Sequence, residues 1–140
     1  NVSGLLSPGL SPGMFGITGN YQQGAPAAFE VEIGGLLQGI DFDYLNVGGN
    51  ALLDGNLLVG LYGGFTPDAT DTFTILTGNA VSGVFANALT QVNVIGGGIF
   101  DVTYTTNSVI LGNYVVPEPS SAALILIAGL RAIFLRRRKI

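Results

Sequence analysis

Hydrophobic and polar residues alternate along the middle of the chain. From Leu45 to Leu61 the odd positions are all small or aliphatic, whereas the even positions are mostly Asn, Asp or Gly. Leu52, Leu58 and Tyr62 are exceptions among the even positions. Because successive side chains of a β-strand point to opposite faces, this period of two predicts β-structure whose inner face carries the odd positions.

Turn residues divide this alternating stretch. One strand of 17 residues would be unusually long, and both Gly49-Asn50 and Gly55-Asn56 offer turn chemistry. We therefore predict several short strands in its place. Similar alternation marks further strands at Phe29-Val31-Ile33, Phe73-Ile75, Phe100-Val102-Tyr104 and Val109-Leu111. The predicted interior consists of Leu45, Val47, Leu53, Leu57, Val59, Leu61, Phe73 and Ile75.

A Gly-Asn dipeptide recurs along the chain at a nearly constant interval. It occurs at Gly19-Asn20, Gly49-Asn50 and Gly78-Asn79. The first two copies are followed by similar apolar runs, Phe29-x-Val31-x-Ile33 and Leu57-x-Val59-x-Leu61. A spacing of about 28–30 residues is typical of stacked repeat architectures. The alternative interpretation is that Gly-Asn is simply a frequent turn dipeptide in a Gly-rich chain.

Composition favours an all-β fold. The chain has 22 Gly among 140 residues, 48% hydrophobic residues and only 10% charged residues, which suits short strands and tight turns better than helices. Two architectures fit: a β-solenoid of stacked parallel strands, and an antiparallel β-sandwich. The stretch Phe100–Leu111, with a turn near Thr105–Ser108, predicts a terminal hairpin that would close the end of such a stack.

Charge is strongly segregated along the chain. Residues 1–130 contain all nine acidic residues and no Lys, Arg or His, whereas residues 131–140 contain all five basic residues. A body without cations has nothing to neutralise phosphates, which argues against nucleic-acid binding. The chain also has no Cys, so disulfides, thiolate metal sites and thiol nucleophiles are excluded.

The body offers few candidates for chemistry. Paired carboxylates such as Asp41 with Asp43, or Glu30 with Glu32, can serve acid–base catalysis or Ca²⁺ binding. We interpret them mainly as solubilising groups that discourage strand pairing at an edge. Ser residues have no His to activate them. No enzyme mechanism, cofactor or metal site is therefore expected.

Aromatic residues suggest one further kind of site. Tyr21, Tyr44, Tyr62 and Phe65 could together form a sugar-stacking surface. The alternation, however, already gives several of them packing roles in the predicted core.

The last 25 residues form a unit of a different kind. Two prolines flank Glu118 at Pro117 and Pro119, and they favour an extended, protease-accessible segment. The apolar run 122–135 has 14 residues, which as a helix would span ~21 Å of a hydrocarbon core about 30 Å thick. Arg131 lies within this run and weakens it as an anchor, although its side chain can snorkel to the interface. The cluster Arg136, Arg137, Arg138 and Lys139 predicts a cytoplasmic stop that leaves the body outside.

This order of proline motif, apolar helix and basic cluster resembles the PEP-CTERM sorting signal. The resemblance implies recognition by an exosortase, a membrane protease, with Pro117, Glu118 and Pro119 as the recognition residues. Arg131 departs from the usual pattern of that region.

The body also resembles a known class, the final segment of autotransporter-like β-helical surface proteins. The resemblance implies a right-handed parallel β-helix, with no catalytic residues to transfer. It rests on an ordered series of short motifs, including Leu6-Ser7-Pro8-Gly9, Ile17-Thr18-Gly19-Asn20-Tyr21, Asp43-Tyr44-Leu45, Gly64-Phe65 and Asp101-Val102-x-Tyr104.

Together these features predict residues 1–115 as the end segment of a β-solenoid from a longer exported protein, and residues 116–140 as its sorting tail with a short transmembrane helix. The expected function is that of a non-catalytic, adhesin-like structural protein. Its expected location is the inner membrane as a precursor, then the cell surface or extracellular matrix of a Gram-negative-type bacterium. The expected partners are an exosortase, the inner membrane and extracellular polysaccharide. The alternative is a β-helical stalk for a polysaccharide-processing enzyme domain upstream.

Overall fold

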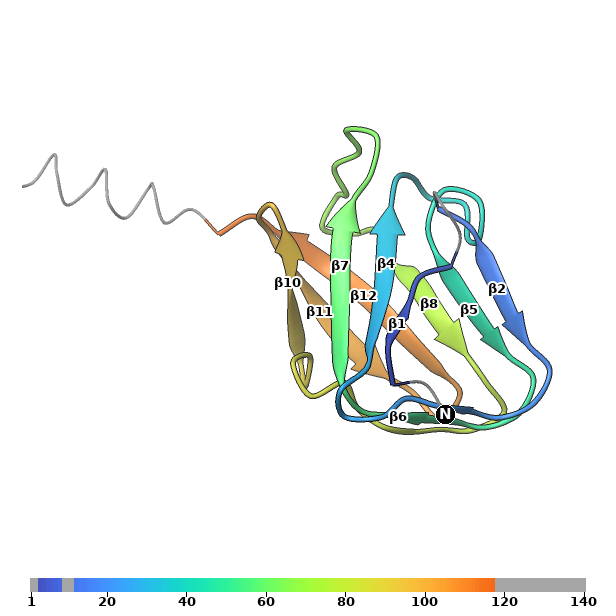
Figure 1. Ribbon diagram of the computed structural model, residues 1–140. Helices are drawn as coiled ribbons and strands as arrows, with labels where there is room; N and C mark the ends of the chain where they lie inside the picture. Colours follow the sequence, from blue (N-terminus) through green and yellow to red (C-terminus); the bar gives the residue numbers. More distant parts are fainter. Residues whose placement is uncertain (1–2, 9–11, 118–140) are drawn as a thin grey trace, which may run out of the picture.

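The computed structural model describes residues 3–8 and 12–117, and in these residues the chain is all-β, without a helix. Glu118, Pro119, the apolar run 122–135 and the basic cluster 136–139 lie outside the described residues. Figure 1 shows the strands wrapped around a single core. They are β1 (Leu5–Leu6), β2 (Met14–Ile17), β3 (Tyr21–Gln22), β4 (Ala28–Ile33), β5 (Tyr44–Val47), β6 (Ala51–Leu53), β7 (Asn56–Leu61), β8 (Phe73–Thr77), β9 (Val81–Gly83), β10 (Gln91–Ile95), β11 (Ile99–Tyr104) and β12 (Ser108–Val115).

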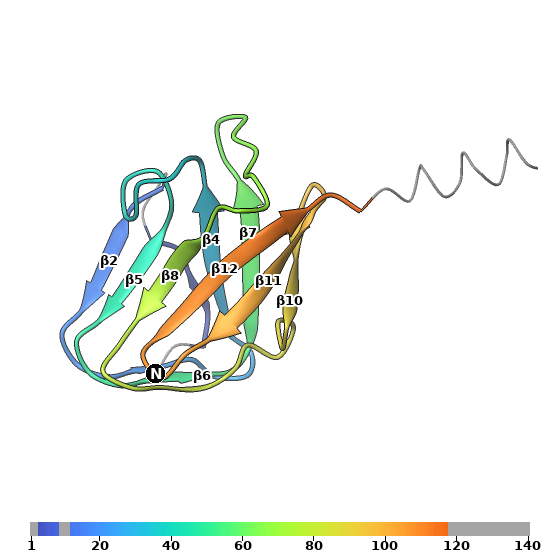
Figure 2. The ribbon, with the colours of Figure 1, turned by 180° about the vertical axis from the view of Figure 1, so that it is seen from behind.

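Most of these strands pair with the strand three places away in the sequence. Parallel pairing joins β1, β4, β7 and β10 into one ladder, β2, β5 and β8 into a second, and β3, β6 and β9 into a third. Antiparallel pairing is confined to the series β10-β11-β12-β8, which links the first two ladders into one nine-stranded sheet. Figures 1 and 2 show the first two ladders on opposite sides of the molecule, with β6 crossing beneath them. An antiparallel sandwich would not contain this much parallel pairing.

The register of the strands reproduces the sequence repeat. Residues of β4 pair with residues of β7 that lie 28 positions further on, so that Phe29 lies beside Leu57 and Val31 beside Val59. The Gly-Asn corners stack as well, because the Gly49 N–H donates to the Gly19 carbonyl over 2.9 Å and the Asn79 N–H donates to the Gly49 carbonyl over 2.8 Å. The recurrence of Gly-Asn is therefore a structural repeat, and we call each turn of the chain through the three ladders a coil.

Gly is required where these corners come close together. A Cβ on Gly49 would lie 2.3 Å from Asn20 Oδ1 and 2.9 Å from the Gly19 carbonyl oxygen. The Asn50 N–H donates to the same Asn20 Oδ1 over 2.8 Å. A side chain at position 49 would therefore push the first two coils apart.

The core follows the predicted alternation closely. Seven of the eight predicted interior residues are buried, and the eighth, Leu61, is partly buried and packs against the same cluster. Alternation continues from β5 through β6 to β7 because the short corners between these strands do not change which face the odd positions occupy. Phe29, Phe73, Phe85 and Phe100 are fully buried, and Phe73 packs edge-on to Phe100 with ring centroids 5.7 Å apart.

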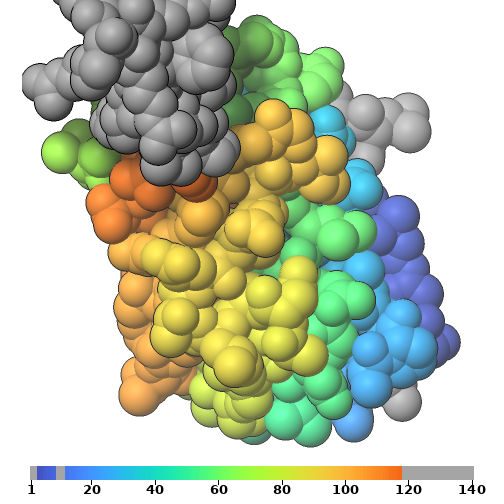
Figure 3. Space-filling model, turned by 90° about the vertical axis from the view of Figure 1, so that its left-hand side faces the viewer, coloured from blue at the N-terminus to red at the C-terminus, as the bar shows by residue number. Residues whose placement is uncertain are grey.

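The predicted hairpin is present, and it closes one end of the stack. Strand β11 pairs with β10, and β12 pairs with β8. The turn between them reaches the third ladder, because the Val81 N–H donates to the Thr106 carbonyl and the Gly78 N–H donates to the Asn107 carbonyl, over 2.8 and 3.0 Å. Figure 3 faces this end and shows β10 and the segment before it (yellow) forming a continuous surface with β11 and β12 (orange).

Candidate functional site

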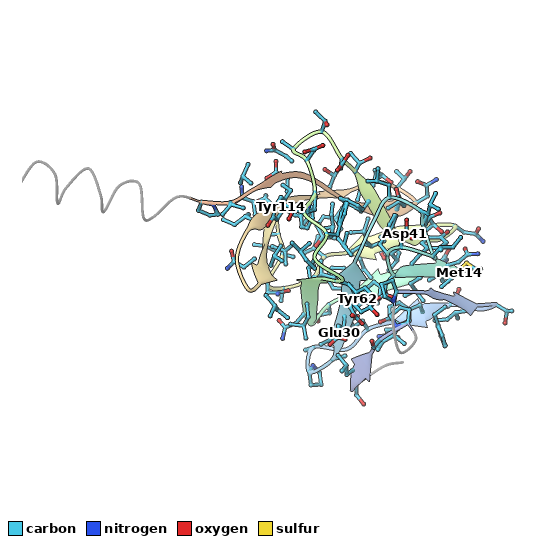
Figure 4. The ribbon with its side chains drawn as sticks, turned by 90° about the horizontal axis from the view of Figure 1, so that it is seen from above. Met14, Glu30, Asp41, Tyr62 and Tyr114 are labelled. Atoms are coloured by element: carbon cyan, nitrogen blue, oxygen red, sulfur yellow. The ribbon has the colours of Figure 1, made fainter. Side chains whose placement is uncertain are left out.

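The chain leaves the body through an exposed segment. Tyr114 is the last buried residue, and its ring packs on Phe100 with centroids 5.0 Å apart. Beyond it, Val115 is 44% exposed and Val116 is 60% exposed, and Pro117 is exposed without regular structure. The segment 115–117 therefore leads from the packed body to the predicted recognition motif. In Figure 4, Tyr114 lies on the side where the chain departs, opposite Met14 and Asp41.

Side-chain amides hold the strand just before this exit. Asn113 adopts a left-handed conformation with φ of 48°, and its Nδ2 donates to Asp101 Oδ2 over 2.9 Å. Gln91 Nε2 donates to the other oxygen of Asp101 over 3.1 Å. These two donors lower the pKa of Asp101, because hydrogen bonds to the ionised form favour it. Strand β12 is thus fixed to β10 and β11 up to its last turn.

Of the predicted sorting residues, the structure describes only Pro117, which is exposed as expected. Among the described residues, no helix has the length and apolar character needed to cross a bilayer. The predicted roles of the recognition motif and of the basic stop remain predictions.

A small hollow lies on the opposite side of the body. Its volume is about 180 Å³, and it is lined by Pro12, Gly34, Ile40, Asp41 and Tyr62. Figure 4 shows Asp41 and Tyr62 on their respective loops. Asp41 Oδ2 accepts a hydrogen bond of 3.1 Å from the Leu37 N–H, which fixes its loop. The hollow holds one carboxylate, whereas acid–base catalysis of the kind considered above needs two facing ones.

Asp43 is buried, so its interpretation as a solubilising surface group is wrong. Its two oxygens accept hydrogen bonds of 2.8 Å from the N–H groups of Gly13 and Glu32. Burial raises the pKa of this carboxyl to about 6, the two N–H donors oppose the rise, and the nearby charges of Glu32 and Glu30 add to it. Asp43 joins the first coil to the second, and it does not pair with Asp41.

The other carboxylate pair lies where the alternation predicted. Glu30 and Glu32 are half-buried on the outer face of β4, and Ser7 Oγ donates to Glu30 Oε1 over 3.2 Å. Nowhere in residues 3–8 and 12–117 do three or more acidic side chains gather as a metal site would require.

The four aromatic residues do not form one surface. Tyr21 is buried and donates to Gln23 Oε1 over 2.7 Å, and burial raises its pKa to about 12. The hydroxyl of Tyr44 is hydrogen-bonded to Thr77 Oγ1. Phe65 packs edge-on to Phe73 at 6.3 Å. Tyr62 alone of the four is largely exposed, so the sugar-stacking surface considered above is not assembled.

Sequence reasoning missed several polar residues that hold the coils together. Gln23 is buried, and its Nε2 donates to the carbonyls of Asp54 and Asn56 over 2.8 and 3.0 Å. Tyr104 donates to the Ala88 carbonyl over 2.5 Å and accepts from the Phe85 N–H over 3.2 Å. The only available signal was a polar residue at a position where the pattern continued inward.

No family model matches the chain, and no curated protein or solved structure matches it significantly.

Proposed function

We propose that the chain is the C-terminal part of an exported bacterial surface protein, with a non-catalytic β-helical body and a PEP-CTERM-like sorting tail. The observation that carries the proposal is the order of features at the exit. A body closed by its hairpin ends at Tyr114, and an exposed segment then leads straight into Pro117-Glu118-Pro119. An extended and accessible segment is what a processing protease needs.

The finer fold in this proposal is the end segment of a right-handed parallel β-helix. Its support is the pairing of every strand from β4 to β9 with the strand three places before it, always in parallel. The stacked Gly-Asn corners give the same periodicity independently. Solenoids of this kind are rigid and elongated, which suits a stalk or an adhesive surface element.

In this proposal the tail acts as an address for an exosortase. The precursor is held in the inner membrane by residues 122–135 and stopped by Arg136, Arg137, Arg138 and Lys139. Loss of residues 120–140 removes all five basic residues and leaves an acidic body at the cell surface, where extracellular polysaccharide is its proposed partner.

Replacing Pro117-Glu118-Pro119 by three alanines tests the address. We expect full-length protein to accumulate in the membrane fraction, whereas the parent protein is shortened and released. A matched control replaces Val116 and Ser121, which flank the motif, and should be processed normally. Mass spectrometry of the surface-exposed protein decides between the outcomes, because material that keeps an intact Arg136–Ile140 terminus would contradict the proposal.

A further inference from the structure

The stack of coils is closed at one end and open at the other. At the closed end, β8, β9 and β10 are all covered by the hairpin β11–β12 or by its turn. At the open end, β1, β2 and β3 each pair on one side only. These three strands run in the same directions as the strands that they cover, so their free edges form one surface (Figures 1 and 2).

Side chains at the open end are left exposed where the next coil buries its own. Phe15 lies beside Leu45 in the register, and it is 43% exposed, whereas Leu45 is 0% exposed. Leu6 lies beside the fully buried Phe29 and is only partly buried. The apolar interior therefore continues to the open surface without a cover there.

The free edges also lack the usual protection. Natural sheets discourage pairing at an edge with charged side chains, prolines or bulges. No acidic or basic residue occurs before Glu30, and β1, β2 and β3 contain no Pro. The most weakly protected edges of the body thus lie on its uncharged end.

The Gly-Asn corners define the orientation of a cover. The Gly49 and Asn50 N–H groups donate to the Gly19 carbonyl and to Asn20 Oδ1, so each corner donates to the corner before it. By the same geometry, the Gly19 and Asn20 N–H groups face the open end. A cover that continues the stack supplies a carbonyl and an Asn side chain to them.

We propose that the open end binds one further coil of the same three-strand repeat, in parallel register and joined in cis before β1. The inference rests on the proposed β-helix. It adds the identity of the occupant: an uncharged Gly-Asn corner opposite Gly19-Asn20, with alternating apolar residues above Leu6 and Phe15.

The chain itself provides such a coil for the test. Residues 24–53 span β4, β5 and β6, and a copy of them can be fused directly before Asn1 of the full chain. Residues 1–4 then separate the copied Leu53 from Leu5, as residues 24–27 separate Gln23 from Ala28. The fusion therefore keeps the corner length that the protein already uses.

Hydrogen exchange over residues 14–22, in the full chain held in mild detergent, is the readout. The fusion should slow exchange there by at least about ten-fold, because the free N–H groups of the edge become paired. The same fusion with the copied Asn50 changed to Ala should lose part of this protection. A fusion carrying the same 30 residues in scrambled order should give none.

Two results would overturn the inference. One is unchanged exchange over residues 14–22 in the fusion while β4 and β5 stay protected, which would leave the β-helix intact and remove only the occupant. The other is a parent chain that forms a stable dimer by light scattering with residues 14–22 already protected, which would identify a second copy as the cover. Failure of the β-helix itself is distinguished by fast exchange of β4 and β5 in the parent chain.

Discussion

At the scale of single residues, Asp43 shows how one buried carboxylate can organise two coils. It accepts the Gly13 N–H, just before β2, and the Glu32 N–H in β4. The body has no Lys, Arg or His, so backbone donors take the part that a cation plays elsewhere. The carboxylate is fixed by hydrogen bonds, while its negative neighbours and its burial oppose ionisation.

Stability should therefore fall as the pH rises from about 4 to 6. The folded-state pKa of Asp43 is raised to about 6 from a model value of 3.8, so the folded protein binds the proton more tightly across that window. Urea unfolding at pH 4.5 and 7.5 should give the higher midpoint at pH 4.5. In Asp43→Asn the dependence should become flatter, and an unchanged slope would show that other carboxylates cause it.

At the scale of elements, the edge between β7 and β10 depends on a side chain. Pairing of β10 with β7 covers Val59 and Gly60 but not Leu57. Asn87 fills the gap, because its Oδ1 accepts the Leu57 N–H and its Nδ2 donates to the Leu57 carbonyl, both over 2.8 Å. The amide of Asn87 thus imitates a backbone unit of the missing strand.

Asn87→Ala should lower the free energy of unfolding by about 1–3 kcal/mol, because it leaves a partly buried N–H and carbonyl without partners. Denaturant titration measures the change. Asn93→Ala is a suitable control, since Asn93 is exposed in β10 and should change stability by less than about 0.5 kcal/mol. Equal effects of the two substitutions would refute the strand-like role of Asn87.

Much of this level of structure could be predicted from the sequence. The alternation from Leu45 to Leu61 identified the interior, and Gly49-Asn50 and Gly55-Asn56 marked real corners. Burial of Asp43 and Gln23 could not be predicted, because their partners come from distant positions such as Gly13 and Asn56. A polar residue is favourable inside only when such partners meet it, and the local pattern does not contain that information.

At the scale of the whole molecule, the charge distribution is one-sided. The sequence before position 131 offers no side-chain cation to its nine acidic groups. Like charges on a compact body repel one another, which destabilises the folded state relative to the extended chain.

Added salt should therefore stabilise the body. Raising NaCl from about 10 to 150 mM shortens the screening length from about 30 to 8 Å, so the thermal midpoint should rise by a few degrees. Glu30→Gln with Glu32→Gln removes two neighbouring charges and should reduce this response. A midpoint that falls with salt would contradict the prediction.

The antiparallel hairpin has a consequence for how the body folds. Its two strands are adjacent in sequence and joined by a tight turn at Thr105–Asn107, whereas parallel neighbours lie about 28 residues or more apart. Short loops close at lower entropic cost than long ones, and local contacts form sooner. We therefore expect β11 and β12 to nucleate folding and the coils to add towards the N-terminus. A chain delivered N-terminus first would then stay extended until its last strands emerged, which is the state in which it can be threaded through a membrane.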